Sequence, residues 1–139
     1  MAVLIRQIRR MKNISIATFA VVVSLVQGQA LAQNSIFDIT FSNFAEGGTT
    51  AGSGWVSGSS ISPGIYEVND GSFTFTSGDG LDAGTYSLLP NPNPPGQSTS
   101  PSGYFLFDNQ VSIDVDPYLN NNGLLFGSGS IEINLSSAL

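Results

Sequence analysis

The segment Ile65–Thr76 reads IYEVNDGSFTFT and carries the strongest fold signal of the chain. Two runs rich in aromatic and β-branched residues, Ile65–Val68 and Phe73–Phe75, flank Asn69-Asp70-Gly71. Asp-Gly between two strand-like runs is a strong hairpin signal, because glycine adopts a positive φ at little cost. The segment therefore predicts a two-stranded hairpin that pairs Ile65–Val68 with Ser72–Thr76.

Other strand patterns lie on both sides of this segment. Apolar residues recur at every second position in two runs, which is the period of a half-buried strand; these runs are Phe37–Phe41 and Val111–Val115. Two shorter runs are also strand candidates, Thr85–Leu89 and Tyr104–Phe107. A second hairpin is expected where Leu124–Phe126 and Ile131–Leu135 flank a turn of glycine and serine at residues 127–130.

Turn-forming residues separate these strands. Residues 45–60 are rich in Gly, Ser and Thr and predict a loop, with a short strand at Trp55 as an option. Residues 90–102 contain five of the seven prolines and predict a Pro/Asn/Ser-rich loop. A linker between two β halves is the alternative, but neither half has enough apolar residues for a core of its own.

No segment after residue 33 shows a helical period. Many short strands with Gly and Pro turns predict an all-β fold, a small antiparallel sandwich or an open meander. One domain is expected over residues 33–139, preceded by a signal-peptide helix over residues 1–32.

The first 32 residues have the three parts of a secretory signal peptide. Four basic residues precede Ile14–Val26, an uncharged and mostly apolar run of 13 residues, and a polar stretch then ends at Ala30-Leu31-Ala32. The small residues Ala30 and Ala32 predict cleavage before Gln33. Cleavage before Leu31 is the alternative. An uncleaved anchor is disfavoured, because a membrane-spanning helix needs about 20 apolar residues.

Cleavage would change the charge of the chain. All four Lys and Arg residues lie in residues 1–32 and all ten Asp and Glu residues lie after them, so the side-chain charge would change from −6 to −10. Without cations, residues 33–139 are expected to bind no nucleic acid. They also contain no His or Cys. This inventory excludes Ser-His-Asp triads, cysteine nucleophiles, Schiff-base lysines and thiolate metal sites.

Two sets of acidic residues have the ligand type that calcium prefers. Asp114 and Asp116 share one face of a predicted strand, and Glu132 lies on another strand that could be its neighbour, so the three are calcium candidates. A solvated outer face is the favoured interpretation. Asp79-Gly80-Leu81-Asp82 also resembles a calcium loop loosely, but its residues are ordinary turn formers. No cofactor is expected, with calcium left as the alternative.

The aromatic residues offer a second kind of candidate site. Trp55, Tyr66, Tyr104 and Tyr118 could form a platform for a sugar ring, although aromatic residues in a small β domain more often pack in the core. Trp55 is the best sugar-contact candidate, because its flanking sequence is polar. A pair of carboxylates could hydrolyse a glycosidic bond, but no pair stands out.

One family resemblance concerns the last third of the chain. Asp108-Asn109, Pro117-Tyr118-Leu119, Gly123–Phe126 and Glu132–Leu135 resemble a run found in exported bacterial proteins of the PEP-CTERM class. That class has a signal peptide, a polar β-rich body without Cys, and a sorting tail with a Pro-Glu-Pro motif. The 139 residues contain no Pro-Glu-Pro motif. The resemblance implies export and an association with exopolysaccharide and biofilm.

The sequence thus predicts an exported, non-enzymatic structural protein of the cell surface or extracellular matrix. The expected location is the periplasm, cell surface or extracellular space of a Gram-negative bacterium, with no membrane association after cleavage. Extracellular polysaccharide and other envelope proteins are the expected partners. A carbohydrate-binding module is the alternative function, and a small hydrolase is the third.

Overall fold

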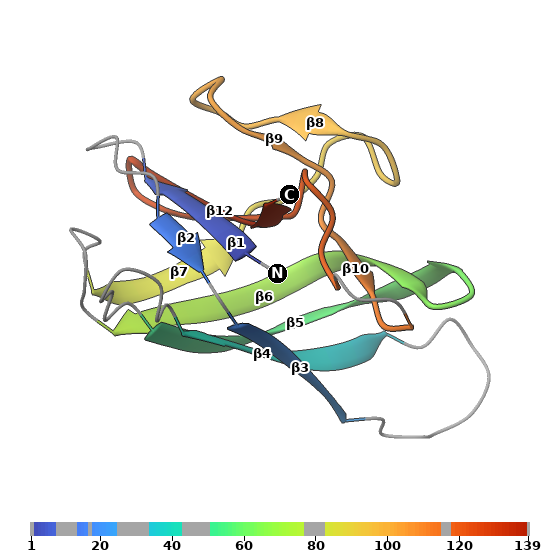
Figure 1. Ribbon diagram of the computed structural model, residues 1–139. Coiled ribbons are helices and arrows are strands. Elements are labelled where there is room, and N and C mark those ends of the chain that lie inside the picture. Colours follow the sequence, from blue (N-terminus) through green and yellow to red (C-terminus); the bar gives the residue numbers. More distant parts are fainter. Residues whose placement is uncertain are drawn as a thin grey trace.

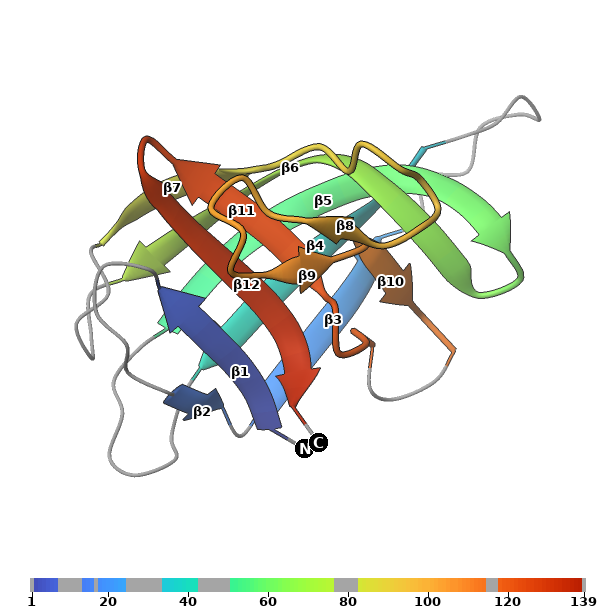
Figure 2. The same cartoon turned by 90° about the horizontal axis from the view of Figure 1, so that it is seen from above.

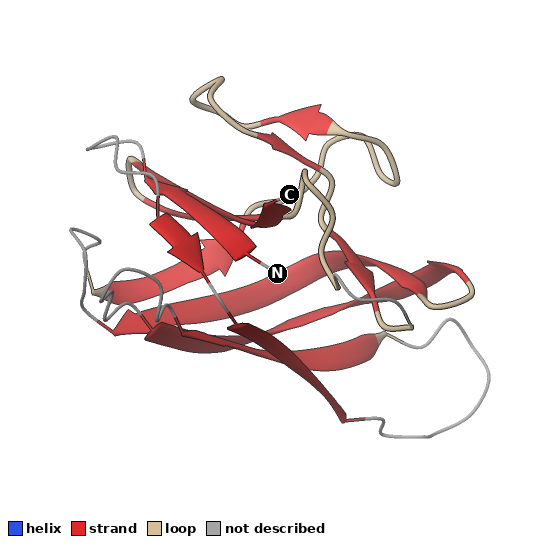
Figure 3. Ribbon diagram, in the orientation of Figure 1, coloured by secondary structure: helices blue, strands red, loops and turns tan. Residues whose placement is uncertain are grey.

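The computed structural model describes residues 2–7, 14–16, 18–24, 34–42, 51–76, 83–114 and 118–138 of the chain. No helix occurs among these residues, and the all-β class is confirmed (Figure 3). The strands are β1 Ala2–Gln7, β2 Ile14–Ile16, β3 Thr18–Ser24, β4 Ser35–Ser42, β5 Ala51–Ser62, β6 Ile65–Thr76, β7 Gly84–Leu88, β8 Ser98–Thr99, β9 Leu106–Phe107, β10 Gln110–Ser112, β11 Leu124–Ser128 and β12 Ile131–Ala138.

Ten of the strands form one antiparallel sheet in the order β2-β1-β12-β11-β7-β6-β5-β4-β3, with β10 paired to β6 off this path. The sheet folds over, so that β1, β2 and β12 lie above β3–β6 in Figure 1. The short β8–β9 pair forms a separate sheet above β11 and β12 (Figures 1 and 2). The architecture is therefore a folded antiparallel sheet with a small third layer.

The main core lies between the two halves of the folded sheet. Its largest fully buried side chains come from β4, β6, β11 and β12 and include Phe37, Phe73, Phe126 and Leu135. Alternation along the strands places every second residue inside. A second, smaller cluster of Phe105, Phe107 and Leu125 packs on the outer face of β11, with Leu89 against it. This cluster attaches the β8–β9 layer to the sheet.

The predicted hairpin at Asn69-Asp70-Gly71 is wrong. Residues 65–76 form one strand, β6, which pairs with β5 along its length. Asn69 is the extra residue of a β-bulge, because Ser57 and Gly58 of β5 pair with Asp70 and Val68. The turn into β6 lies earlier, at Pro63-Gly64, where Gly64 has a φ of 73°.

Gly71 allows β5 and β6 to pack closely and does not form a turn. A Cβ at Gly71 would lie 2.7 Å from the carbonyl oxygen of Trp55, so β5 and β6 approach more closely here than a side chain permits. The Asp70 carboxylate accepts a hydrogen bond from the Gly71 N–H at 2.8 Å. Asp-Gly therefore shapes the bulge, and the long pairing with β5 outweighs the local turn preference.

Most of the other predicted strands are present. The hairpin of β11 and β12 is confirmed, with Gly129 at a φ of 60° in its turn. Phe37–Phe41 lies within β4, and Thr85–Leu88 within β7. The predicted strand over Val111–Val115 is shorter, because β10 ends at Ser112. The loop predicted over residues 45–60 is wrong in its second half, since β5 begins at Ala51 and runs to Ser62.

The predicted Pro-rich loop over residues 90–102 is interrupted by β8 at Ser98–Thr99. Residues 90–97 contain no strand, and β8 pairs with β9 across the following residues. Asn91 holds the loop closed by donating from its Nδ2 to the Gly96 carbonyl oxygen at 2.8 Å. Leu89, which immediately precedes the loop, packs against the second core cluster.

The described parts of residues 1–32 are strands, and the helix expected there is not seen among them. β1 pairs with β12, and β3 pairs with β4. The segment is rich in Ile and Val, whose branched side chains favour a pleated strand when a sheet edge is open to pair with. Residues 8–13, 17 and 25–32 lie outside the described residues.

Candidate functional site

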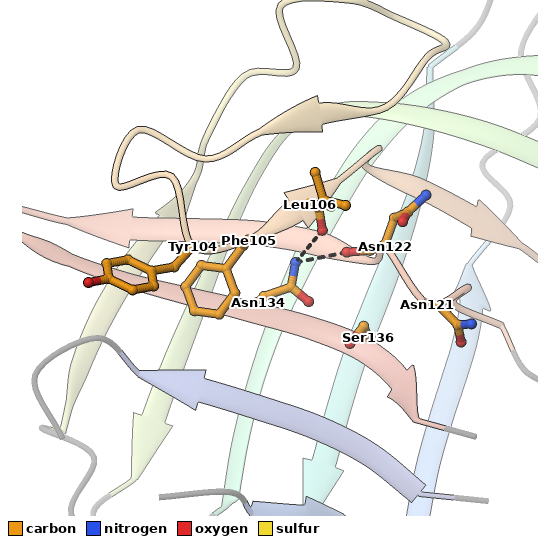
Figure 4. Close-up of a pocket in the computed structure, with 7 residues that line it drawn as sticks. All are labelled: Tyr104, Phe105, Leu106, Asn121, Asn122, Asn134 and Ser136. Carbon is orange, nitrogen blue, oxygen red and sulfur yellow. Dashed lines mark hydrogen bonds between the residues drawn. The ribbon is translucent and has the colours of Figure 1, made fainter. Parts of the chain in front are cut away.

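The described surface contains a groove on the outer face of β12. Residues of β9, of the turn before β11 and of β12 line it, and its volume is about 380 Å³. The lining side chains are Tyr104, Phe105, Leu106, Asn121, Asn122, Asn134 and Ser136 (Figure 4). One end is therefore aromatic and the other end carries amides.

Strand alternation explains why amides lie on this face. Ile133 and Leu135 point into the main core, so Asn134 and Ser136 point outward. Asn134 Nδ2 donates to the Asn122 carbonyl oxygen at 2.8 Å and to the Leu106 carbonyl oxygen at 3.4 Å. Figure 4 shows Asn134 between the two walls of the groove. This amide joins the walls and fixes the width of the groove.

The polar wall of the groove is built by the turn Asn120-Asn121-Asn122-Gly123. Asn120 Oδ1 accepts from the N–H groups of Asn122 and Gly123, both at 2.9 Å. Gly123 has a φ of 68° and lies so close to β12 that a Cβ would be 2.0 Å from the Leu135 carbonyl oxygen. Asn and Gly are therefore required here by the local backbone.

A buried aspartate, Asp108, stabilises this turn through hydrogen bonds. Asp108 Oδ2 accepts from Asn120 Nδ2 at 2.6 Å and from Asn122 Nδ2 at 3.1 Å. Asp108 Oδ1 accepts from the Gln110 N–H at 3.2 Å. These hydrogen bonds satisfy a carboxylate that has no cation beside it among the described residues. The carboxylate thereby fixes the positions of two asparagines of the turn.

Asn109 links three parts of the sheet. It is fully buried and has a φ of 52°, a left-handed conformation that asparagine tolerates better than most residues. Its Nδ2 donates to the Leu89 carbonyl oxygen at 2.8 Å, and its Oδ1 accepts from the Leu125 N–H at 3.1 Å. Its own carbonyl oxygen accepts from the Val68 N–H at 2.9 Å.

The buried Glu67 carboxyl lies beside Asn91 and has a raised pKa. Burial raises its pKa, the hydrogen bond from Asn91 Nδ2 to Oε1 at 3.0 Å lowers it, and the negative charge of Asp108 raises it. Its Oε2 is buried and has no hydrogen-bond partner in the structure. A proton on Glu67 relieves both the burial of charge and the repulsion from Asp108.

The groove has the chemistry of a polyhydroxylated ligand. The Tyr104 side chain is 73% exposed, and its ring offers a flat apolar face with a polar tip. Side-chain amides carry both donors and acceptors, as sugar hydroxyls do. Ser136 and Tyr104 add hydroxyl groups to the amides of the lining. The arrangement can bind a polyhydroxylated ligand.

Trp55, the predicted sugar contact, lies away from this groove. It is 39% exposed and pairs with Asp38 and Ser72 on the outer face of β4–β6. Its neighbour Val56 points into the core. Because the groove lies on the outer face of β12, Trp55 and Tyr104 are on opposite sides of the folded sheet.

The calcium candidates have separate partners. Asp114 is exposed and lies against Gly64, at the turn between β5 and β6. Glu132 is buried, and both its oxygens accept hydrogen bonds from Ser102, from N–H at 2.9 Å and from Oγ at 2.6 Å. No group of three or more acidic, His or Cys residues that could hold a metal occurs among the described residues. Asp116 lies outside them.

The cleavage residues Ala30, Ala32 and Gln33 and the pair Asp79 and Asp82 also lie outside the described residues. Asn121, Asn122 and Asn134 were not among the site residues predicted from the sequence. The run of three asparagines before Gly123 was the available signal, but it indicates a turn as readily as a binding wall.

Comparison of the chain with known protein families, with curated proteins and with solved structures finds no match. In the part of the chain that the structure describes, no helix is long and apolar enough to cross a bilayer.

Proposed function

We propose that this chain is an exported, non-enzymatic protein of the cell surface or extracellular matrix of a Gram-negative bacterium. The observation that carries the proposal is the use of its acidic side chains. Asp70, Asp108 and Glu132 are all held by hydrogen bonds that fix a bulge or a loop. None of the three is paired with Lys, Arg, His or Cys, because residues 33–139 contain none of these.

The charge and the N-terminus support the compartment. Residues 1–32 have the order of a secretory signal, and their removal leaves a side-chain charge of −10. The resemblance of the last third of the chain to PEP-CTERM proteins agrees with export. Extracellular polysaccharide and envelope proteins are the partners that this location implies, and so acidic a domain is a poor ligand for nucleic acid.

Fractionation tests this proposal. The full chain with a C-terminal tag is expressed in a Gram-negative bacterium that secretes exopolysaccharide, and cytoplasm, periplasm, surface and matrix are assayed separately. The tag is expected outside the cytoplasm, mainly with surface or matrix material. Accumulation of the full-length chain in the cytoplasm would overturn the proposal.

A second candidate function is carbohydrate binding, and the groove on β12 favours it. Exposed Tyr104 stands at one end and the amides of Asn121, Asn122 and Asn134 stand along the other. Such a site binds the apolar face of a sugar ring and hydrogen-bonds its hydroxyls. This function is compatible with a matrix protein, since binding would retain the domain on polysaccharide.

A glycan array of the exported protein tests this candidate with two aromatic variants. Tyr104→Ala is expected to lose binding to any glycan that the wild-type protein retains, whereas Trp55→Ala, on the opposite face, is expected to keep it. If only Trp55→Ala lost glycan binding, the sugar site would lie on β5 and not in the groove. Absence of binding to every glycan by the wild-type protein would remove the candidate.

A further inference from the structure

Both outer edges of the central sheet are covered by residues that a signal peptidase would remove. β3 covers β4 through seven residue pairs, from Thr18↔Ser42 to Ser24↔Ile36. β1 covers β12 through six residue pairs, from Ala2↔Ala138 to Gln7↔Ile133. Both covering strands belong to residues 1–32. Cleavage before Gln33 would leave β4 and β12 as edges with open backbone N–H and C=O groups.

We propose that the mature chain assembles head to tail, with the β4 edge of one copy pairing with the β12 edge of the next. This inference rests on the proposed export and cleavage. An uncovered edge strand is a template for a further strand, because its backbone groups lack partners on one side. The structure shows that each of these two edges accepts an antiparallel strand.

The direction of the strands fits a second copy. The remaining path β12-β11-β7-β6-β5-β4 has six strands, and every neighbouring pair is antiparallel. With an even number of strands, β4 and β12 run in opposite directions. β12 of a second copy in the same orientation is therefore antiparallel to β4 of the first. A contact between two different edges repeats from copy to copy and builds a filament, or a ring where the rotation between copies closes.

The length and the residue pattern of the edges agree as well. β4 and β12 each contain eight residues. Phe37 and Ile39 of β4 point into the core, and so do Ile133 and Leu135 of β12. These inner residues lie on the same side of the continuous sheet. In one register of β4 against β12, the apolar inner faces of two neighbouring copies therefore form one surface, and so do their polar outer faces.

The test separates assembly from export by cutting the purified chain in vitro. A specific protease site replaces residues 27–32 of the full chain, the folded protein is purified, and its mass in solution is measured before and after cutting. We expect a monomer before cutting and a series of multiples of the protomer mass after it. A protein that stays monomeric after cutting, with or without the fragment still bound, overturns the proposal while leaving export untouched.

Cysteine cross-linking then identifies the edges, because the chain has no Cys of its own. Ile36→Cys on β4 and Ser136→Cys on β12, which both lie on the outer face of the sheet, are prepared separately, cut, mixed and oxidised. Head-to-tail pairing predicts a disulfide between the two variants. Ile61→Cys is the control, because Ile61 is similarly exposed (42%, against 50% for Ile36) but lies on the interior strand β5. Disulfides only between two Ile36→Cys chains would show two-fold pairing through β4 and overturn the head-to-tail arrangement.

Discussion

Replacement of Asn109 by alanine is expected to destabilise the fold strongly. Two groups lose their partner, the Leu89 carbonyl oxygen and the buried Leu125 N–H. Each unsatisfied group costs about 1–3 kcal/mol. Alanine at a φ of 52° adds about 1 kcal/mol, because its Cβ crowds the backbone in the left-handed region. The expected loss is about 3–7 kcal/mol, a large share of the roughly 5–15 kcal/mol that stabilises a domain.

Two further variants separate these contributions. Asn109→Gly removes the same hydrogen bonds but adopts the positive φ freely, so it should lose about 1 kcal/mol less than alanine. Asn109→Asp keeps an acceptor for the Leu125 N–H but places a buried charge beside the Leu89 carbonyl oxygen. It should therefore be less stable than Asn109→Gly at neutral pH and recover partly in acid, where the carboxyl is protonated.

Urea unfolding of the full chain, followed by the fluorescence of Trp55, measures these losses, since Trp55 is the only tryptophan. Asn121→Ala is the matched control, because Asn121 is an exposed asparagine of the groove; a surface substitution of this kind changes stability by about 0.5 kcal/mol or less. If Asn109→Ala falls within about 1 kcal/mol of the wild type, the assignment of Asn109 as the link between the sheet segments is refuted.

Three other predictions follow from the same contacts. Glu67→Gln should raise the midpoint of urea unfolding at pH 7, because the pKa of Glu67 is higher in the folded chain than in the unfolded chain, where it is near 4.5. The stability that Glu67 contributes is therefore full below that pH and is lost as the pH rises through the folded pKa. Equal midpoints of variant and wild type at every pH would contradict this. Gly71→Val should lower the melting temperature, and Gly71→Ala should lower it less, because any Cβ at this position would lie 2.7 Å from the Trp55 carbonyl oxygen. An unchanged melting temperature would show that β5 and β6 do not approach so closely. Residues 33–139 should gain thermal stability equally from sodium chloride and calcium chloride at matched ionic strength, since ten carboxylates repel one another without a cation; a shift at micromolar calcium alone would revive a calcium site.

The strand positions could largely be predicted, because alternation of apolar and polar residues is a local signal. It located β4, β7, β11 and β12. The hairpin at Asn69-Asp70-Gly71 failed because the same dipeptide shapes a turn or a bulge, and the choice depends on a partner strand distant in sequence. That partner, β5, was itself hidden, since a stretch rich in Gly and Ser has no alternating pattern.

The candidate site was harder to predict than the fold. Asn134 is polar at a position that alternation marks as outward, but its role in joining two walls depends on the carbonyl groups of Leu106 and Asn122. Backbone carbonyls have no sequence signature. The exposure of Tyr104 likewise depends on how residues 98–107 fold over β11. Trp55 was preferred from the sequence because its neighbours are polar. Those neighbours belong to β5, where small polar residues form the outer face of the strand.

Export with cleavage is the claim on which both the matrix function and the edge assembly depend. Its most direct test is the intact mass of protein recovered outside the cytoplasm of an expressing Gram-negative cell. The account predicts a chain that begins at Gln33, with the N-terminal glutamine free or cyclised to pyroglutamate. A recovered mass that retains residues 1–32 would contradict it, because β1, β2 and β3 would then remain part of the functional protein.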